Sequence, residues 1–428
     1  MLVTALFVVA LFLNIPIAMS LGVASVGYAL IYMMRTGNST IMDLVVQSFA
    51  SALDSMPLLA IPFFVLAGDI MMVGGISRRL VSVCMRWFNK FPGAIGVVTV
   101  IACAIFAAIS GSGPATTAAI GGIMLPAMAK DGYNKGFSAS IVATAGALGP
   151  VIPPSLCFIM YGVVAQQSIT ALFMSGIVPG ILMAIALCIY VVFCAKRYDF
   201  GGKFDWKMEK SKGWRDSPFW ALMVPVVILG GIYGGVFTPT EAAIAAVDYG
   251  LIVSIFIYRE IKIKDLFKIF KPTCITIGSI SIIACGAAAF GRLLTIEQIP
   301  TAIAHTILSL SSNKFIILLL INILLLLVGC VMETLAAIII LTPLLLSIVI
   351  PLGVDPIHFG CIMVVNLVIG MCTPPVGVNL FVAVRVGDVT LGEMKNWLVT
   401  SILALIAVLM FITYVPATTL FLPRLLLK

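Results

Sequence analysis

The sequence predicts an all-α polytopic membrane protein, and three observations support this prediction: the composition, the long apolar runs and the position of the charges. Of the 428 residues, 62% are hydrophobic and 10% are charged, and the mean hydropathy is +1.20. A soluble fold cannot bury so much apolar surface. The run 316–328 is almost unbroken Ile and Leu, whereas a transmembrane β-barrel alternates apolar and polar residues.

The charged residues lie mainly in short connections between apolar runs, which is the pattern that the cytoplasmic bias of Lys and Arg produces. The net charge of +8 therefore does not indicate a nucleic-acid partner. Two amphipathic basic arms, 76–90 and 259–271, are expected to contact anionic membrane lipid. The first residues lack a basic n-region, so we interpret them as a retained membrane segment.

A hydrophilic stretch at 196–217, expected to be a cytoplasmic linker, divides the chain into two halves. The first half, 1–195, is predicted to contain scaffold helices in about 1–75, an arm helix at 76–90, a hairpin at 92–129, an interrupted helix at 136–165 and a connecting helix at 169–195. The second half, 218–396, is predicted to contain scaffold helices at 218–257, an arm at 259–271, a helix at 272–294, an outer arm at 297–311, a hairpin at 314–350 and an interrupted helix at 356–385. A transmembrane helix is predicted at 397–428.

The two halves are related by a shift of 221 residues. The shift places the pattern GxxxPP at 149–154 on the same pattern at 370–375. The arm 76–90 carries Arg and Lys residues, whereas its counterpart 297–311 carries neither. Equivalent connections therefore face opposite sides of the membrane, and the repeats are predicted to be inverted, with both termini in the periplasm.

Four breaks interrupt the apolar runs: turns at 110–114 and 329–334, and Gly/Pro-rich stretches at 146–154 and 370–377. Each Pro removes a backbone donor and frees carbonyl groups upstream. Freed carbonyls and nearby hydroxyls form an oxygen cage of the kind that Na⁺ accepts, and a helix that starts after a turn offers N–H groups to a carboxylate. Inverted repeats with such breaks are typical of secondary transporters.

Four motifs are spread along the chain: SGSGPATTAAIGG at 110–122, GALGPVIPPS at 146–155, FTPTEAA at 237–243 and MCTPPVGVN at 371–379. With these motifs the sequence resembles the large membrane (M) subunit of TRAP (tripartite ATP-independent periplasmic) transporters. The resemblance implies a multi-pass protein of the bacterial inner membrane, in which a transport domain of two re-entrant helical hairpins and two interrupted helices moves against a scaffold as an elevator. It also implies Na⁺-coupled uptake of an organic acid, together with a small four-helix membrane subunit (Q type) and a periplasmic substrate-binding protein (P type).

The resemblance further implies where ions and substrate bind, with two or more Na⁺ ions and no organic cofactor. The first Na⁺ site is expected to consist of Ser110 and the carbonyl groups of Gly149, Ile152 and Pro154. The second is expected to consist of Gly329, Cys330, Gly370, Thr373 and Pro375. Substrate contacts are expected from Ser112, Gly113, Pro114, Thr116, Pro150, Glu333, Thr334 and Pro374.

Structural roles compete with these functional ones. Ser, Gly and Thr at helix breaks also permit close helix packing. Glu241 is interpreted as a capping acid, with Thr238 or Thr240 as the cap residue, rather than as a gating or substrate residue. For Glu333 a helix cap and a cation site both remain open.

Titratable residues beside apolar runs are costly unless they are paired or exposed. Asp54, Asp69 and Asp248 are interpreted as paired or interfacial, Arg292 as reaching the interface from a helix end, and His305 and His358 as solvated. The ten cysteines contain no CxxC pair and are expected to be packing residues.

The leading interpretation is a Na⁺-coupled transporter subunit. The alternative is a one-component Na⁺/carboxylate symporter that works without a binding protein, and a passive channel would show uptake independent of the Na⁺ gradient. A membrane enzyme is not expected, because the two histidines are isolated and no HExxH or CxxC motif is present. Two carboxylates favour two basic anchors. Since the membrane core offers at most Arg292, sialic acid is favoured over a C4-dicarboxylate.

Overall fold

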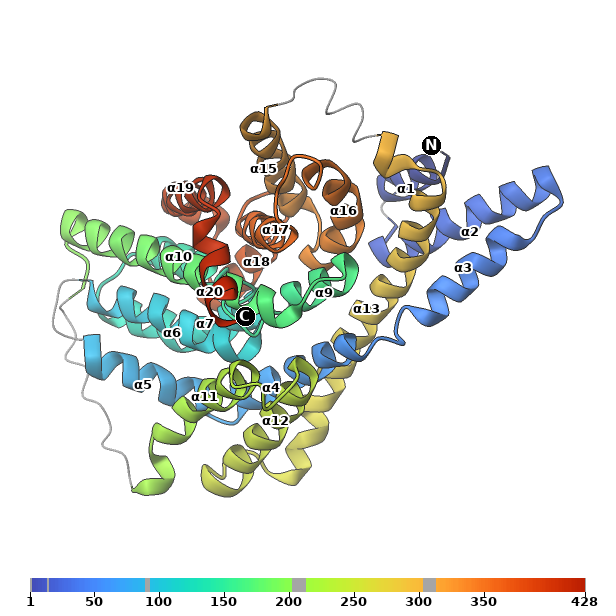
Figure 1. Ribbon diagram of the computed structural model, residues 1–428. Helices are drawn as coiled ribbons and strands as arrows, with labels where there is room; N and C mark the ends of the chain where they lie inside the picture. Colours follow the sequence, from blue (N-terminus) through green and yellow to red (C-terminus); the bar gives the residue numbers. More distant parts are fainter. Residues whose placement is uncertain (1, 14, 89–92, 202–212, 303–312, 428) are drawn as a thin grey trace.

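The computed structural model describes residues 2–13, 15–88, 93–201, 213–302 and 313–427 (Figure 1). Within these ranges the regular secondary structure is entirely helical. Seven of the described helices are long and apolar enough to cross a membrane. These findings confirm the predicted class, an all-α polytopic membrane protein.

The first half of the chain contains the helices α1 (Leu2–Phe12), α2 (Ile17–Thr36), α3 (Thr40–Ser51), a 3₁₀ turn η1 (Met56–Leu59), α4 (Ala60–Val73), α5 (Ile76–Phe88), α6 (Ala94–Ser110), α7 (Gly113–Lys130), α8 (Lys135–Gly146), α9 (Leu156–Ala165) and α10 (Ile169–Tyr198). The second half contains η2 (Trp214–Asp216), α11 (Phe219–Tyr233), α12 (Pro239–Leu251), a π-helical turn η3 (Ile252–Ile257), α13 (Ile263–Ile296), α15 (Lys314–Val331), α16 (Thr334–Val349), α17 (Pro356–Gly370), α18 (Val378–Gly387), α19 (Leu391–Tyr414) and α20 (Ala417–Leu426).

The helices pack in two groups (Figure 1). In one group the long helix α13 packs on α2, α3 and α4, and α12 packs on α4. In the other group α8 packs on α19, α7 on α18, α15 on α17 and α10 on α20. The groups touch where α4 contacts α6 and α9 and where α13 contacts α16. Helices from both halves of the sequence contribute to each group.

The interval of 221 residues also relates the observed helix boundaries. Helix α7 starts at Gly113 and α16 at Thr334, and 334 − 113 = 221. Helix α8 starts at Lys135 and α17 at Pro356, which gives the same interval. Both expected interrupted helices are broken in the structure, between α8 and α9 and between α17 and α18.

Two expected boundaries differ from the structure. From Ile263 onward, the arm expected at 259–271 and the helix expected at 272–294 form one continuous helix, α13, which contains Pro272. A Pro inside a membrane helix is tolerated where neighbouring helices pack around it, and α13 packs on α2, α3 and α4. The single C-terminal helix expected at 397–428 starts at Leu391 and is broken after Tyr414, where Pro416 precedes α20.

Candidate functional site

A cavity of about 470 Å³ lies between the two groups of helices. Its lining residues come from the α6–α7 tip (110–115), the start of α16 (333–335), the two interrupted helices (Pro150, Leu156, Cys157, Met371 and Val378), α4 (Val65, Gly68 and Asp69) and α13 (Ile275, Thr276, Ser279, Ile280 and Ile283). A cavity of this size can hold a small organic ligand. The breaks that were singled out in both halves of the sequence therefore meet at one cavity.

The α6–α7 tip depends on Gly111. This residue ends α6 with φ of +60°, in the left-handed region that favours glycine. Its position is also crowded, because a Cβ atom there would lie 2.7 Å from the carbonyl oxygen of Pro154. The backbone of the tip thus lies directly against the break between α8 and α9, where the N–H of Leu156 donates to the carbonyl of Gly111 over 3.4 Å.

Oxygen atoms gather at this first break. The hydroxyls of Ser110 and Thr116 lie 2.9 Å apart, and Thr116 donates to the carbonyl of Ser112 over 2.8 Å. Gly149 leaves room for them, because a Cβ atom there would lie 2.5 Å from the Ser112 carbonyl oxygen and 2.9 Å from the Thr116 hydroxyl. The side chain of Ile152, whose carbonyl was expected at the same site, lies near Gly180 of α10.

The second break brings together Gly329, Cys330, Gly370 and Thr373. A Cβ atom on Gly370 would lie 2.4 Å from the carbonyl carbon of Gly329 and 2.9 Å from the amide nitrogen of Cys330. The Cys330 carbonyl accepts from the N–H of Val376 over 3.1 Å, and the Thr373 hydroxyl donates to the carbonyl of Ile369 over 2.9 Å. Pro374 and Pro375, expected in the substrate and ion sites, are exposed.

The chemistry of the two breaks suits a hard cation, which prefers oxygen ligands. The first break groups two hydroxyls, Ser110 and Thr116, with the Ser112 carbonyl. The second offers the Thr373 hydroxyl, which donates to the Ile369 carbonyl, and the carbonyl of Cys330, which already accepts one hydrogen bond. In the described part of the chain no three His, Cys, Asp or Glu side chains cluster as a softer metal would require.

The cavity lining contains carboxyl groups but no basic side chains. Among the described lining residues the carboxyl groups are those of Asp69 and Glu333, and there is no Lys, Arg or His. Glu333 is the N-cap of α16, since its Oε2 accepts from the N–H of Ala336 over 2.9 Å. Of the two roles left open for Glu333, the cap is therefore observed. The buried hydroxyl of Thr334 lines the same cavity without a hydrogen-bond partner in the described ranges.

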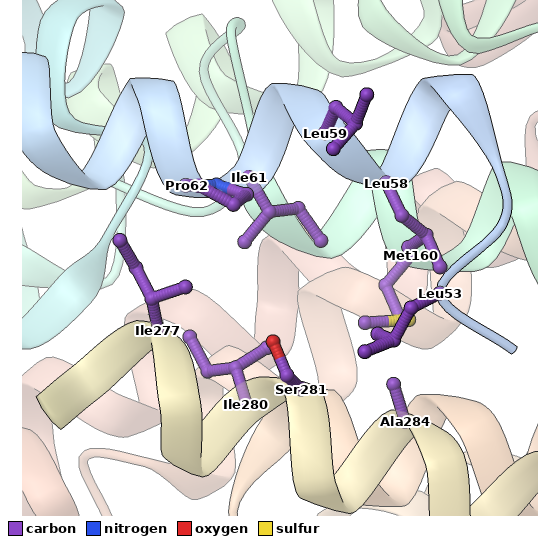
Figure 2. Close-up of a pocket in the computed structure, with 10 residues that line it drawn as sticks. All are labelled: Leu53, Leu58, Leu59, Ile61, Pro62, Met160, Ile277, Ile280, Ser281 and Ala284. Carbon is purple, nitrogen blue, oxygen red and sulfur yellow. The ribbon is translucent and has the colours of Figure 1, made fainter. Parts of the chain in front are cut away.

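Most residues expected to contact substrate do line the cavity: Ser112, Gly113, Pro114, Pro150, Glu333 and Thr334. Thr116 instead joins Ser110 in the oxygen cluster, and Pro374 lies outside the lining. A smaller apolar pocket of about 120 Å³ shares Ile280 with the cavity. Figure 2 shows this pocket with η1 and α4 on one side and α13 on the other. Among its labelled side chains, Ser281 supplies the one oxygen.

Asn379 is a residue of this region that the sequence analysis missed. Its side chain is fully buried at the start of α18, and a Cβ atom on Gly113 would lie 2.9 Å from Asn379 Oδ1. The amide nitrogen donates to the carbonyl of Ala143 in α8 over 3.3 Å. Asn379 thus joins the second interrupted helix to the first one and to the first tip. Its position as the last residue of the motif at 371–379 was the available signal.

Glu241 and His358 lie outside the cavity lining. Glu241 forms a capping box with Thr238, whose N–H donates to Glu241 Oε2 over 2.8 Å, so the capping role is confirmed. His358 was expected to be solvated, and this is wrong: it is 2% exposed, with its ring nitrogens 2.7 Å from the Thr419 hydroxyl and 3.3 Å from the Thr413 carbonyl. Helix α20 folds back over α10 and α17 and covers this ring.

The remaining titratable residues fall in different places. Asp54, Asp248 and Arg292 are exposed, while Asp69 is half-buried. His305 lies outside the described residues.

Comparison with known proteins places this geometry in a family. Residues 4–418 match the family described as "Tripartite ATP-independent periplasmic transporter, DctM component". The isethionate TRAP transporter permease protein DctMQ of Oleidesulfovibrio alaskensis is 47% identical over 418 residues, which cover 97% of this chain and 65% of that protein. The C4-dicarboxylate TRAP transporter large permease protein DctM of Rhodobacter capsulatus is 34% identical over 100% of this chain and 99% of that protein. The sialic acid TRAP transporter large permease protein SiaM of Vibrio cholerae is 35% identical over 97% and 96%.

A solved structure supports the fold alone. The YdaH transporter of Alcanivorax borkumensis has a TM-score of 0.66 at 15% identity, over 96% of this chain and 98% of that one. The family match and the relatives above 30% identity identify the family, whereas this structural similarity identifies only the fold. On that evidence, the chain belongs to the DctM family, the large permease subunits of TRAP transporters.

Proposed function

We propose that the chain carries out Na⁺-coupled uptake of an organic acid that a periplasmic binding protein delivers. The main support is that the helix breaks of both halves meet at one cavity of about 470 Å³, with an oxygen cluster of Ser110, Ser112 and Thr116 beside it. A Na⁺ ion at the first break would be held by Ser110 and Thr116 hydroxyls and nearby carbonyls. A second Na⁺ would lie at Gly370 and Thr373.

The solute carries a single acid group. A second acid group would need a basic partner, and the described lining contains carboxylates and no Lys, Arg or His. This favours sialic acid, a monocarboxylate, over a C4-dicarboxylate. The second candidate is isethionate, a monosulfonate, because the relative named for it is 47% identical to this chain.

The transport cycle we propose is an elevator in an inner membrane. The group of α6–α9 and α15–α18 carries the cavity past the group of α2–α4 and α11–α13, which forms the scaffold. The repeats are inverted, and both termini lie in the periplasm. A small membrane subunit completes the scaffold, and the basic helix α5 contacts anionic lipid.

Reconstitution tests this proposal. Proteoliposomes that contain the chain and its small subunit should take up the solute only with the binding protein outside and an inward Na⁺ gradient. Sialic acid, isethionate and succinate are compared as radiolabelled solutes. Uptake by the chain alone would establish the one-component symporter instead, and uptake that ignores the Na⁺ gradient would indicate a passive channel.

A further inference from the structure

The scaffold side of the cavity presents hydrogen-bond acceptors. Asp69 of α4 lies there, and its Oδ2 accepts from the Thr273 hydroxyl of α13 over 2.5 Å, while no hydrogen bond to Oδ1 is found in the described ranges. The neighbouring hydroxyls of Thr276 and Ser279 donate to carbonyls of their own helix, over 3.1 Å to Pro272 and 2.9 Å to Ile275. Because these hydroxyl groups already donate their protons, the side chains on this side of the cavity can only accept further hydrogen bonds through their oxygen lone pairs.

The opposite side of the cavity presents donors. Helix α7 starts there at Gly113 and is 18 residues long, and its N-cap residue Ser112 makes no side-chain cap hydrogen bond. The first N–H groups of such a helix attract an anion. Thr334 adds a hydroxyl that is 98% buried and has no partner in the described part of the chain. The start of α16 is different, because the Glu333 carboxylate already caps it.

We propose that Asp69 determines specificity by accepting a hydrogen bond from a hydroxyl or ammonium group of a transported solute that carries one acid group. The acid group of the solute lies at the start of α7, and its donor-bearing end faces Asp69. This inference rests on the proposed function and narrows its substrate class to hydroxy- or amino-substituted acids. An unsubstituted dicarboxylate is rejected, because its second carboxylate would face Asp69 and like charges repel in a site of low polarity.

Binding to the membrane complex itself tests this inference, without the binding protein and its own specificity. The chain and its small subunit in nanodiscs with NaCl are titrated with isethionate, taurine and ethanesulfonate, which carry a hydroxyl, an ammonium or only a hydrogen on the carbon farther from the sulfonate. N-acetylneuraminate and succinate complete the set. The variants are Asp69→Ala and the near-isosteric Asp69→Asn, and Ser281→Ala is the control because Ser281 lines the smaller apolar pocket on the same helix α13.

We expect at least one of isethionate, taurine and N-acetylneuraminate to bind, and isethionate or taurine to bind about 10- to 100-fold more tightly than ethanesulfonate, the range for a hydrogen bond to a charged group. In Asp69→Ala, isethionate and taurine should bind no more tightly than ethanesulfonate. In Asp69→Asn this preference should be smaller and succinate should bind, and in Ser281→Ala the preference should be unchanged. An unchanged ratio in Asp69→Ala, succinate binding by the unaltered chain, or no binding of any donor-bearing acid overturns the inference. Loss of Na⁺-driven uptake in the proteoliposomes would instead refute the proposed function, so the two failures are distinct.

Discussion

Gly370 of α17 and Gly329 of α15 touch backbone to backbone, so closely that a Cβ atom on Gly370 would lie 2.4 Å from the carbonyl carbon of Gly329. No side chain fits between these helices at the second break. The contact places the α15–α16 turn against the break in the interrupted helix. The Na⁺ site expected at Thr373 takes residues from both segments, so it requires this contact.

The first prediction is that Gly370→Ala separates these two helices. The added methyl group meets backbone, which cannot rotate away, so we expect a loss of about 1–3 kcal/mol in stability and a weaker Na⁺ dependence of uptake. Gly278→Ala is the control, because a Cβ atom there meets nothing within 4 Å and α13 is helical at that point. Thermal unfolding of the purified complex measures the difference, and equal melting temperatures for the two variants would contradict the packing described here.

The second prediction concerns Na⁺. Ser110→Ala removes one hydroxyl from the first break and Thr373→Ala one from the second, so each should raise the Na⁺ concentration for half-maximal uptake by about 5- to 30-fold, taking 1–2 kcal/mol for a lost oxygen ligand. Ser25→Ala is the control, since that buried hydroxyl donates only to the Leu21 carbonyl of its own helix over 2.8 Å. Unchanged Na⁺ activation curves in both Ser110→Ala and Thr373→Ala would show that neither hydroxyl is a Na⁺ ligand and would refute both proposed sites.

The sequence located the breaks well because Gly and Pro act locally on the backbone. Gly111 ends α6 and the Gly/Pro stretches separate α8 from α9 and α17 from α18, as expected. Helix α3 was not resolved within the scaffold stretch, because its sequence TIMDLVVQSFAS mixes polar and apolar residues. The continuity of α13 through Pro272 was also missed, since that depends on packing against α2, α3 and α4.

Tertiary contacts explain the misjudged residues of the site. Thr116 lies six residues from Ser110, and its place in the oxygen cluster follows from the fold of the tip rather than from the motif. Asn379 meets Gly113 across more than half of the chain. His358 is buried because α20 turns back after Pro416. None of these pairings is encoded in local periodicity.

The third prediction concerns the Arg79 cluster, which joins α5 to the second half of the chain. Arg79 lies 2.8 Å from Glu260 and 2.5 Å from Asp216, and its guanidinium carbon lies 3.6 Å from the centre of the Tyr258 ring. Burial lowers the pKa of Arg79, but the hydrogen bonds with Asp216 and Glu260 outweigh this and leave that pKa above its ordinary value. The charge is therefore retained at all accessible pH values.

Arg79→Gln should destabilise the protein by about 1–3 kcal/mol, because it leaves partly buried carboxylates without their cation. The side chain of Arg79 is 12% exposed, whereas that of Arg78, which also reaches Glu260, is 63% exposed. Arg78→Gln is therefore the control and should cost less than about 1 kcal/mol. Equal losses in thermal stability for the two variants would show that the buried position of Arg79 does not matter.

The fourth prediction separates capping from gating at Glu241. Its carboxylate accepts from both the N–H and the hydroxyl of Thr238 at 2.8 Å, and a negative charge is favoured in the first turn of a helix. Glu241→Ala should lower the melting temperature, because it removes the side chain that accepts from the N-cap residue in this capping box. Glu393→Ala, in the second capping box with Thr390, is the matched variant and should lower the melting temperature by a similar amount. A cap acts on the stability of its helix alone, so the Na⁺ activation curve and the solute preference of the Glu241 variant should match those of the unaltered chain. A shift in either one, with thermal stability unchanged, would instead assign Glu241 to gating or substrate binding.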